Sequence, residues 1–134
     1  MTKVNINGKL AHRDEAGISP FDSVVQGGDA VWEGLRVHAG HPAFLDQHLD
    51  RLWEGAAAIA LDIGLTRSEL AARIYQTLRA NDMTEGAHVR LMVTRGPKST
   101  PYQDPRLSAG PATVVVIAEH KVPLPETLER GLSL

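Results

Sequence analysis

The sequence contains no cysteine, which excludes a disulfide scaffold, a thiolate metal site and a cysteine nucleophile. It has no large excess of either charge, since 14 Lys and Arg residues face 16 Asp and Glu residues. That balance leaves no basic footprint for nucleic acid or for an anionic membrane. No apolar run approaches the roughly 20 residues of a membrane span, and the polar N-terminus has no signal core. We therefore expect a cytoplasmic protein without nucleic-acid or membrane partners.

Several familiar catalytic motifs are also missing. The sequence has no nucleophile elbow and no phosphate loop of the GxxxxGK[ST] type. None of its histidine pairs has metal-ligand spacing on one element, so we expect no metal site. What needs explaining is the stretch GGDAVWEGLR at residues 27–36, where Gly34 interrupts a strand pattern. Glycine inside a strand often marks a place where a ligand or another backbone comes close.

The order of predicted elements indicates an α+β domain with an antiparallel sheet and two helices packed on it. We expect a hairpin at Asn7-Gly8, a strand over 30–38 with a partner ending near residue 45, and strands over 88–96 and 112–119. The last of these is a continuous apolar run, which predicts a strand covered on both faces. We expect residues 1–120 to form an N-terminal α+β domain. We expect residues 121–134 to form an interdomain connector and the start of a missing C-terminal domain, where another strand begins.

Two helices are predicted between these strands. The first begins at Asp46, a good N-cap, and the second begins at Thr66, which forms a capping box with Glu69. Each helix has one apolar face, made of Leu49, Leu52, Trp53, Ala56 and Ala60 in the first and of Leu70, Ile74 and Leu78 in the second.

Alternation along the strands sorts their side chains into two faces. Trp32, Gly34 and Arg36 share one face, and the core face holds Val31, Leu35 and Val37. An aromatic side chain, a gap and a cation can together hold an apolar organic anion. Arg90 lies on a similar mixed face of the strand at 88–94. The alternative is that Arg36 and Arg90 are solvated residues, because antiparallel sheets often leave one side wet.

Arg51 is a second candidate for binding an anion. It follows the predicted helix start by one turn, and His48 lies three residues before it. An arginine there can bind phosphate with help from the helix dipole and the free backbone amides. The alternative is a surface arginine paired with Asp50 or Glu54.

Three stretches resemble the N-terminal domain of class IV, fold type IV pyridoxal-phosphate enzymes. They are NINGKLAHRDEAGISPFD, GGDAVWEGLRVHAGHPAFLDQHLDRLWEGAAAIAL and HVRLMVTRG, and they cover most of residues 5–96 in the family's order and spacing. The group includes branched-chain aminotransferases, D-amino-acid aminotransferases and aminodeoxychorismate lyases. The Glu-Gly-Leu-Arg sequence at residues 33–36 is similar to the branched-chain branch.

The resemblance implies a function and a set of roles. It implies transfer of an amino group from a branched-chain L-amino acid to 2-oxoglutarate, with pyridoxal 5'-phosphate as cofactor, in a homodimer with a shared active site. Arg51, in the pattern His-x-x-Arg-Leu, is expected to contact the cofactor phosphate. The substrate pocket is expected to include Trp32, Gly34, Arg36 and Arg90, with Gly34 leaving space beside the bound amino acid.

The sequence departs from the family pattern in two ways. Gly27 stands where many relatives carry a tyrosine, so the pocket wall is altered. The family's catalytic lysine, which forms a Schiff base with the cofactor, is expected C-terminal of Leu134. The lysines present lack its context: Lys3, Lys9, Lys98 and Lys121. We therefore expect this chain alone to be inactive.

Other functions remain open on the same residues. One group of alternatives keeps the scaffold and changes the substrate: a D-amino-acid transaminase, an amine transaminase or an aminodeoxychorismate lyase. Another alternative is a stand-alone dimerisation module without catalytic activity.

Overall fold

The centre of the molecule is a six-stranded antiparallel sheet with the strand order β2-β1-β6-β5-β3-β4. The computed structural model describes residues 2–102, 104–121 and 124–133. The strands are β1 (Lys3–Ile6), β2 (Lys9–His12), β3 (Ala30–His38), β4 (His41–Pro42), β5 (Ala87–Thr94) and β6 (Thr113–His120). The helices are α1 (Ser23–Gly27), α2 (Leu45–Ala58), α3 (Arg67–Ala80) and α4 (Pro125–Arg130), with a short 3-10 helix at Pro105–Leu107.

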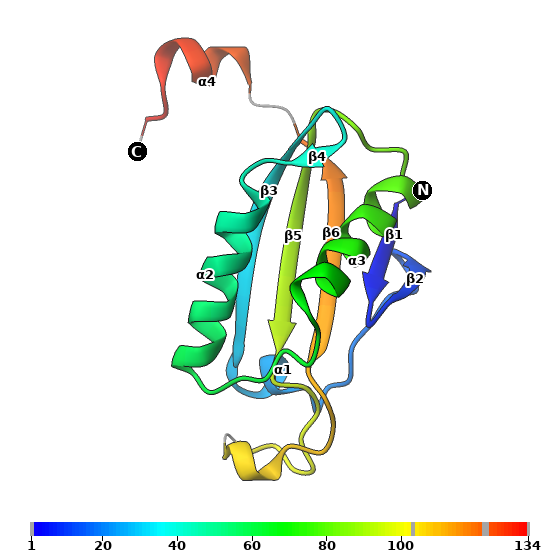
Figure 1. Ribbon diagram of the computed structural model, residues 1–134, viewed down its shortest axis with the longest axis vertical. Helices are drawn as coiled ribbons and strands as arrows, with labels where there is room; N and C mark the ends of the chain where they lie inside the picture. The colour runs from blue at the N-terminus through cyan, green and yellow to red at the C-terminus, as the bar shows by residue number, and fades with distance from the viewer. Residues whose placement is uncertain (1, 103, 122–123, 134) are drawn as a thin grey trace.

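Helices α2 and α3 cover the same face of the sheet. Helix α2 packs along β3, and α3 packs over β6 and β1 (Figure 1). We call the opposite side the open face; it carries Trp32, Gly34, Arg36, His88 and Arg90. The α+β class and the antiparallel sheet with two helices packed on it are confirmed.

The core lies between the covered face of the sheet and the two helices. Alternate strand residues point into it, as a period of two requires. Each fully buried leucine, isoleucine or valine contributes about 1.5 to 3 kcal/mol relative to exposure. The core residues of the central strands and the two helices are Leu35, Val37, Ala87, Val89, Leu91, Val93, Val114, Val116, Ala118, Leu49, Leu52, Ala56, Leu70, Ile74 and Leu78.

Local sequence signals account for several elements. Asn7 and Gly8 both have positive φ, 54° and 85°, and they join β1 to β2 as the predicted hairpin turn. Thr66 accepts a hydrogen bond from the backbone N–H of Glu69, whose side chain accepts one from the backbone N–H of Thr66. The predicted capping box therefore begins α3, and the predicted strand over 30–38 matches the bounds of β3.

The start of α2 differs from the prediction. Its N-cap is Phe44, which has φ 55° and makes no side-chain capping hydrogen bond, so Asp46 is not the cap. The strand before it, β4, has only two residues, and the chain turns from it directly into the helix. Asp46 lies instead in the first helical turn, where its negative charge is favourable beside the free N–H groups.

Two further predictions were wrong. Strand β6 is covered on one face only, because its open-face residue Ile117 is 37% exposed while Val116 is fully buried. Helix α1 follows Ser19-Pro20, a pair typical of a turn or a helix start, and Asp22 caps the helix by accepting a hydrogen bond from the N–H of Val24. The predicted terminal strand is absent from residues 131–133, which follow α4, while Leu134 lies outside the described residues.

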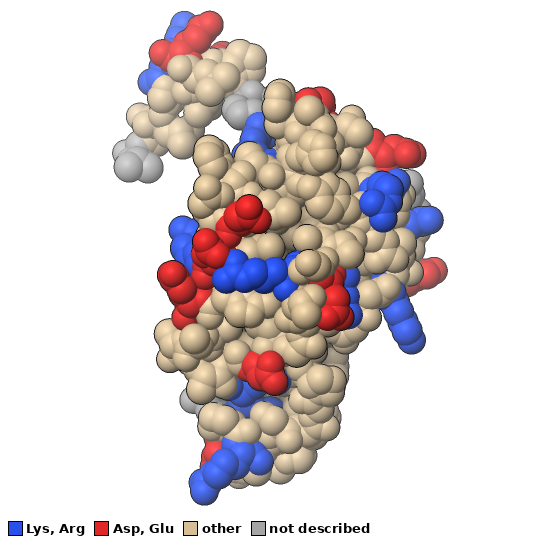
Figure 2. Space-filling view, viewed as in Figure 1, with Lys and Arg blue, Asp and Glu red and all other residues tan. Residues whose placement is uncertain are grey.

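Charged side chains of both signs lie next to one another over the helix-covered face (Figure 2). Arg67 of α3 is ion-paired with Asp50 of α2, and its guanidinium lies 5.2 Å from the centre of the Trp53 ring. These contacts join the two helices at the surface, above the apolar core. Among the described residues, no helix combines the length and the apolar character needed to cross a membrane.

Candidate active site

Strand β3 places the predicted site residues on opposite sides of the sheet. Trp32, Gly34 and Arg36 lie on the open face, and Glu33 lies on the covered face among core residues. Arg51, on α2, contacts Glu33 from the covered side. The predicted residues therefore form two groups, with β3 between them.

Three side chains make up the first group, which we call the anchor cluster: Glu33, His48 and Arg51. Glu33 is only 3% exposed. Arg51 Nε donates to both carboxylate oxygens of Glu33, at 2.9 and 3.1 Å, and Arg51 Nη2 donates to Oε1 at 2.8 Å. His48 Nδ1 lies 2.7 Å from the same Oε1. One buried carboxylate thus orients two side chains of α2.

The anchor cluster keeps Glu33 ionised. Burial alone raises the pKa of Glu33, but hydrogen bonds from Arg51 and His48 outweigh it, and the pKa lies below its ordinary value. A carboxylate accepts hydrogen bonds only, so the Nδ1 atom of His48 carries the hydrogen that lies between them.

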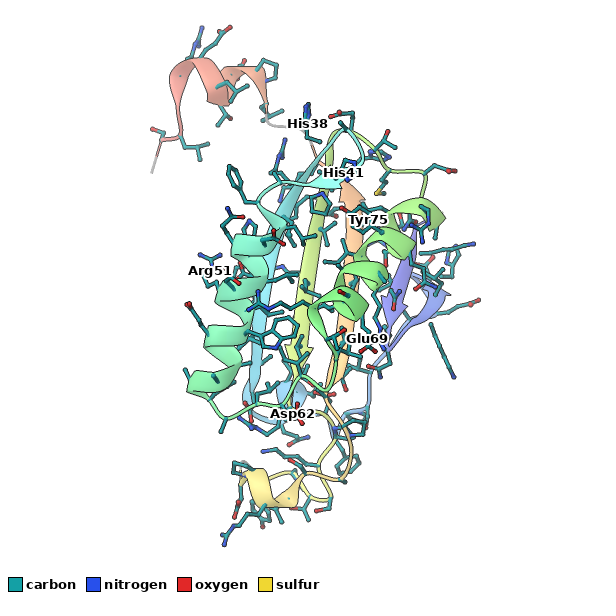
Figure 3. The ribbon with its side chains drawn as sticks, viewed as in Figure 1. His38, His41, Arg51, Asp62, Glu69 and Tyr75 are labelled. Atoms are coloured by element: carbon teal, nitrogen blue, oxygen red, sulfur yellow. The ribbon has the colours of Figure 1, made fainter. Side chains whose placement is uncertain are left out.

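Arg51 keeps part of its guanidinium available for a ligand. Its carboxylate partner is Glu33, and it pairs with neither Asp50 nor Glu54. Asp50 is ion-paired with Arg67 instead. Among the described residues, Arg51 Nη1 has no hydrogen-bond partner, and the side chain is 70% exposed. It lies on the outer side of α2, away from α3 (Figure 3).

The surroundings of Arg51 fit a phosphate group. A hollow of about 260 Å³ is lined by Gln47, His48 and Arg51. An arginine fixed along one edge by a buried carboxylate presents its other edge with little loss of side-chain freedom. These residues therefore suit the phosphate end of pyridoxal phosphate, and they would form part of its site.

The second group lies on the open face, where the indole of Trp32 supports Arg90. The guanidinium carbon of Arg90 is 3.9 Å from the centre of the Trp32 ring, and Trp32 is 56% exposed. Among the described residues, Arg90 makes no hydrogen bond and no ion pair, so its N–H groups face solvent. Arg36 and Arg90 are both exposed. Their exposure would also be expected if this face of the sheet were simply covered by solvent.

The other predicted residues of β3, Gly34 and Arg36, lie on the same face as this pair. Gly34 is the cross-strand neighbour of Arg90. The imidazole of His88 lies over Gly34, because a Cβ atom there would be 3.1 Å from His88 Cε1. Arg36 donates to the carbonyl of Lys121 at 3.2 Å. Gly27 is the exposed last residue of α1.

An apolar hollow of about 360 Å³ adjoins this group on the open face. Met92, the open-face neighbour of Trp32 in the register, is one of its lining residues. Val115 and Ile117 of β6 also line it, as does Ile18. The open face therefore offers an apolar surface next to free cationic groups, which suits an amphipathic organic anion.

Sequence reasoning missed three residues of these groups: Glu33, His48 as a partner of Glu33, and His88. The sequence did contain a signal for Glu33. Alternation places this acidic residue on the core face of β3, and a buried carboxylate needs a hydrogen-bonding partner. Nothing in the sequence identifies that partner, because the contact joins a strand to a helix.

Solved structures with this fold include aminotransferases and a lyase. A T.th. branched-chain amino acid aminotransferase, complexed with N-(5'-phosphopyridoxyl)-L-glutamate, matches with a TM-score of 0.75 and 26% identity. The match covers 87% of this chain and 40% of that one. A 4-amino-4-deoxychorismate lyase from Pseudomonas aeruginosa matches with a TM-score of 0.74 and 28% identity, over 92% and 42% of the two chains.

Sequence comparisons identify the family. The family model described as amino-transferase class IV matches residues 30–133, and this chain belongs to that family. The branched-chain-amino-acid aminotransferase-like protein 1 of Arabidopsis thaliana is 43% identical over 89% of the chain. A putative branched-chain-amino-acid aminotransferase of Methanocaldococcus jannaschii is 37% identical over 94%. A D-alanine aminotransferase of Bacillus licheniformis is 34% identical over 75%.

These relatives are longer than this chain. It spans 21% of the Arabidopsis protein, 42% of the archaeal one and 35% of the bacterial one. The predicted family and its similarity to branched-chain aminotransferases are confirmed.

Proposed function

We propose that the protein takes part in the transfer of an amino group from a branched-chain L-amino acid to 2-oxoglutarate, with pyridoxal 5'-phosphate as cofactor. The anchor cluster is the observation that supports the cofactor most directly. The T.th. enzyme, solved with a phosphopyridoxyl-glutamate compound, has the same fold. Pyridoxal phosphate, when bound, supplies an electron sink for negative charge at the substrate α-carbon.

Arg51 holds the phosphate in this proposal. Glu33 fixes its Nε and Nη2 groups, and the free Nη1 group donates toward the hollow that Gln47 and His48 line. A charge-assisted hydrogen bond of this kind contributes about 1.5 to 3 kcal/mol. The buried carboxylate orients Arg51 before the ligand arrives, so less side-chain entropy is lost on binding.

The open face receives the substrate in this proposal. The Trp32 indole and the neighbouring hollow offer apolar surface to a branched side chain, and Arg90 offers free N–H groups to the second carboxylate of 2-oxoglutarate. Arg36 lies at the edge, held by the carbonyl of Lys121. Gly34 leaves room in this layer, part of which the His88 ring occupies.

Three further parts of this proposal concern the whole protein. We propose a homodimer with a shared active site, a catalytic lysine C-terminal of Leu134, and no transaminase activity in this chain alone. The relatives are longer than this chain, which leaves room for that lysine in a longer protein. A cytoplasmic location likewise stays a prediction.

Replacing Arg51 tests the cofactor site. We expect Arg51→Ala to weaken binding of pyridoxal phosphate about 10- to 150-fold, because it removes the charge-assisted contact to phosphate. Binding is measured by titrating the purified protein with the cofactor and following its absorbance. Arg67→Ala is the matched control, since Arg67 is a surface arginine of α3 paired with Asp50, and its affinity should match that of the unchanged protein. Equal affinity in both variants would overturn the proposed role of Arg51.

A substrate panel tests the alternatives. The D-alanine aminotransferase and the aminodeoxychorismate lyase among the relatives support D-amino acids or aminodeoxychorismate as rival substrates. L-leucine as the best donor would support the branched-chain proposal, whereas D-alanine or aminodeoxychorismate would replace it. A protein that binds no cofactor and forms an oligomer would instead be the dimerisation module.

A further inference from the structure

Two side chains of β5, His88 and Arg90, lie next to each other on the open face with nitrogen atoms to spare. Among the described residues, neither side chain makes a hydrogen bond, and the guanidinium carbon of Arg90 lies 3.9 Å from the centre of the Trp32 ring. Stacking leaves the edge of a guanidinium free. An incoming anion therefore meets unused donors of Arg90 beside the imidazole of His88.

Gly34 sets the position of His88. A Cβ atom at Gly34 would lie 3.1 Å from Cε1 and 3.2 Å from Nε2 of the imidazole, closer than ordinary van der Waals contact. The ring therefore lies over the backbone of β3, at the residue that is the cross-strand neighbour of Arg90. Part of the room at the glycine is thus occupied by the ring of a titratable residue, held near a cation.

The charges around His88 come from three strands. Arg36 of β3 and Glu119 of β6 are its cross-strand neighbours, Arg90 lies two residues along β5, and Lys121 follows β6. Burial makes the largest contribution to the lowered pKa of His88. The positive charges of Lys121, Arg36 and Arg90 lower the pKa further, and the negative charge of Glu119 raises it. The imidazole is therefore mainly neutral at pH 7 when the open face holds no anion.

We propose that His88 takes up a solvent proton when the second carboxylate of a dicarboxylic substrate binds beside Arg90. This inference rests on the proposed function, in which branched-chain and dicarboxylic molecules share one pocket. A bound carboxylate offsets one of the positive charges around His88 and accepts a hydrogen bond from the imidazolium, and both effects raise the pKa of the ring. A branched apolar side chain meets the neutral ring and the Trp32 indole instead. The proton comes from solvent and stays on His88, and the carboxylate remains ionised.

Calorimetry with glutarate tests the inference without any catalytic readout. Because the bound site has the higher His88 pKa, affinity is greatest below the free-site pKa and falls as pH rises through the bound-site pKa. We expect glutarate to bind about fivefold or more weakly at pH 8 than at pH 6. Titrations at pH 7 in buffers of different ionisation enthalpy should show proton uptake with glutarate and none with 4-methylvalerate.

Two variants and one probe separate the outcomes. His88→Gln should bind glutarate with no proton uptake and with little pH dependence, while His120→Gln, at an exposed position of β6, should behave as the unchanged protein. Histidine NMR should show the His88 midpoint rising with glutarate. Absence of glutarate binding, binding without proton uptake, or uptake that persists in His88→Gln would overturn the inference. Failure to bind pyridoxal phosphate would overturn the proposed function alone.

Discussion

Glu33 is a buried carboxylate that two side chains of α2 share, and much of the site depends on it. Its two oxygens accept from Arg51 and His48 in a setting that is 3% exposed. An amide in its place keeps one acceptor oxygen and loses the charge. The free energy of unfolding and the orientation of Arg51 should therefore both respond to this one residue.

We expect Glu33→Gln to lower the free energy of unfolding by about 1 to 3 kcal/mol at pH 7, because the buried acceptor of the Arg51 and His48 hydrogen bonds loses its charge. Urea unfolding followed by circular dichroism measures it. Glu54→Gln is the control: Glu54 is an exposed residue of α2, and the change there should stay within about 0.5 kcal/mol. Equal losses in the two variants would contradict the role given to Glu33.

The same variant gives a pH dependence. The folded-state pKa of Glu33 is depressed below 4.5, so its stabilising contribution is full above the unfolded-state pKa. That contribution is lost as pH falls through the lower folded-state pKa. The difference in unfolding free energy between the unchanged protein and Glu33→Gln should therefore shrink as pH falls below 4.5. A difference that stays constant down to pH 3 would show that the charge is not responsible.

Single residues also show how far the sequence determines the site. Alternation correctly places Trp32, Gly34 and Arg36 on one face, because side-chain direction along a strand is a local property. The partner of Arg51 is not local: Asp50 and Glu54 are near in sequence, yet the buried Glu33, 18 positions away, forms the pair. Only the packing of α2 on β3 decides between them.

At the scale of elements, the capping box of α3 offers a direct test. Thr66→Ala removes the side-chain acceptor for the Glu69 N–H and should lower the free energy of unfolding by about 1 kcal/mol. Thermal and urea unfolding measure it. Ser68→Ala, one residue inside the same helix and exposed, should change stability by less than about 0.5 kcal/mol. A similar loss at both positions would mean that the cap contributes nothing specific.

Element boundaries followed from the sequence wherever the signal is local. Asn7-Gly8 fixes a hairpin and Thr66 with Glu69 fixes a helix start, because each motif satisfies its own backbone groups. Asp46 is of a residue type that caps helices, but α2 begins before it, at Leu45. The chain turns into the helix at Phe44, directly after the two-residue β4. The run at 112–119 is apolar on both faces, and composition alone does not show that helices cover only one.

At the scale of the whole molecule, one core should account for most of the stability. Leu91 is fully buried at the centre of β5, whereas Leu128 on α4 is 75% exposed, and α4 lies away from the sheet (Figure 1). We expect Leu91→Ala to cost about 2 to 5 kcal/mol in unfolding free energy. Leu128→Ala should cost less than about 0.5 kcal/mol. A large loss in Leu128→Ala would mean that α4 packs against the rest of the protein.

The alternation of β3 also has a consequence for engineering. Because consecutive residues serve opposite faces, a library at positions 32, 34, 36 and 88 can redesign what the open face accepts while Glu33 goes on holding Arg51. Deleting one residue within β3 would exchange the two faces for every residue on one side of the deletion. The ligand preference of the open face and the orientation of Arg51 can therefore change separately by substitution, but neither tolerates a change in the length of this strand.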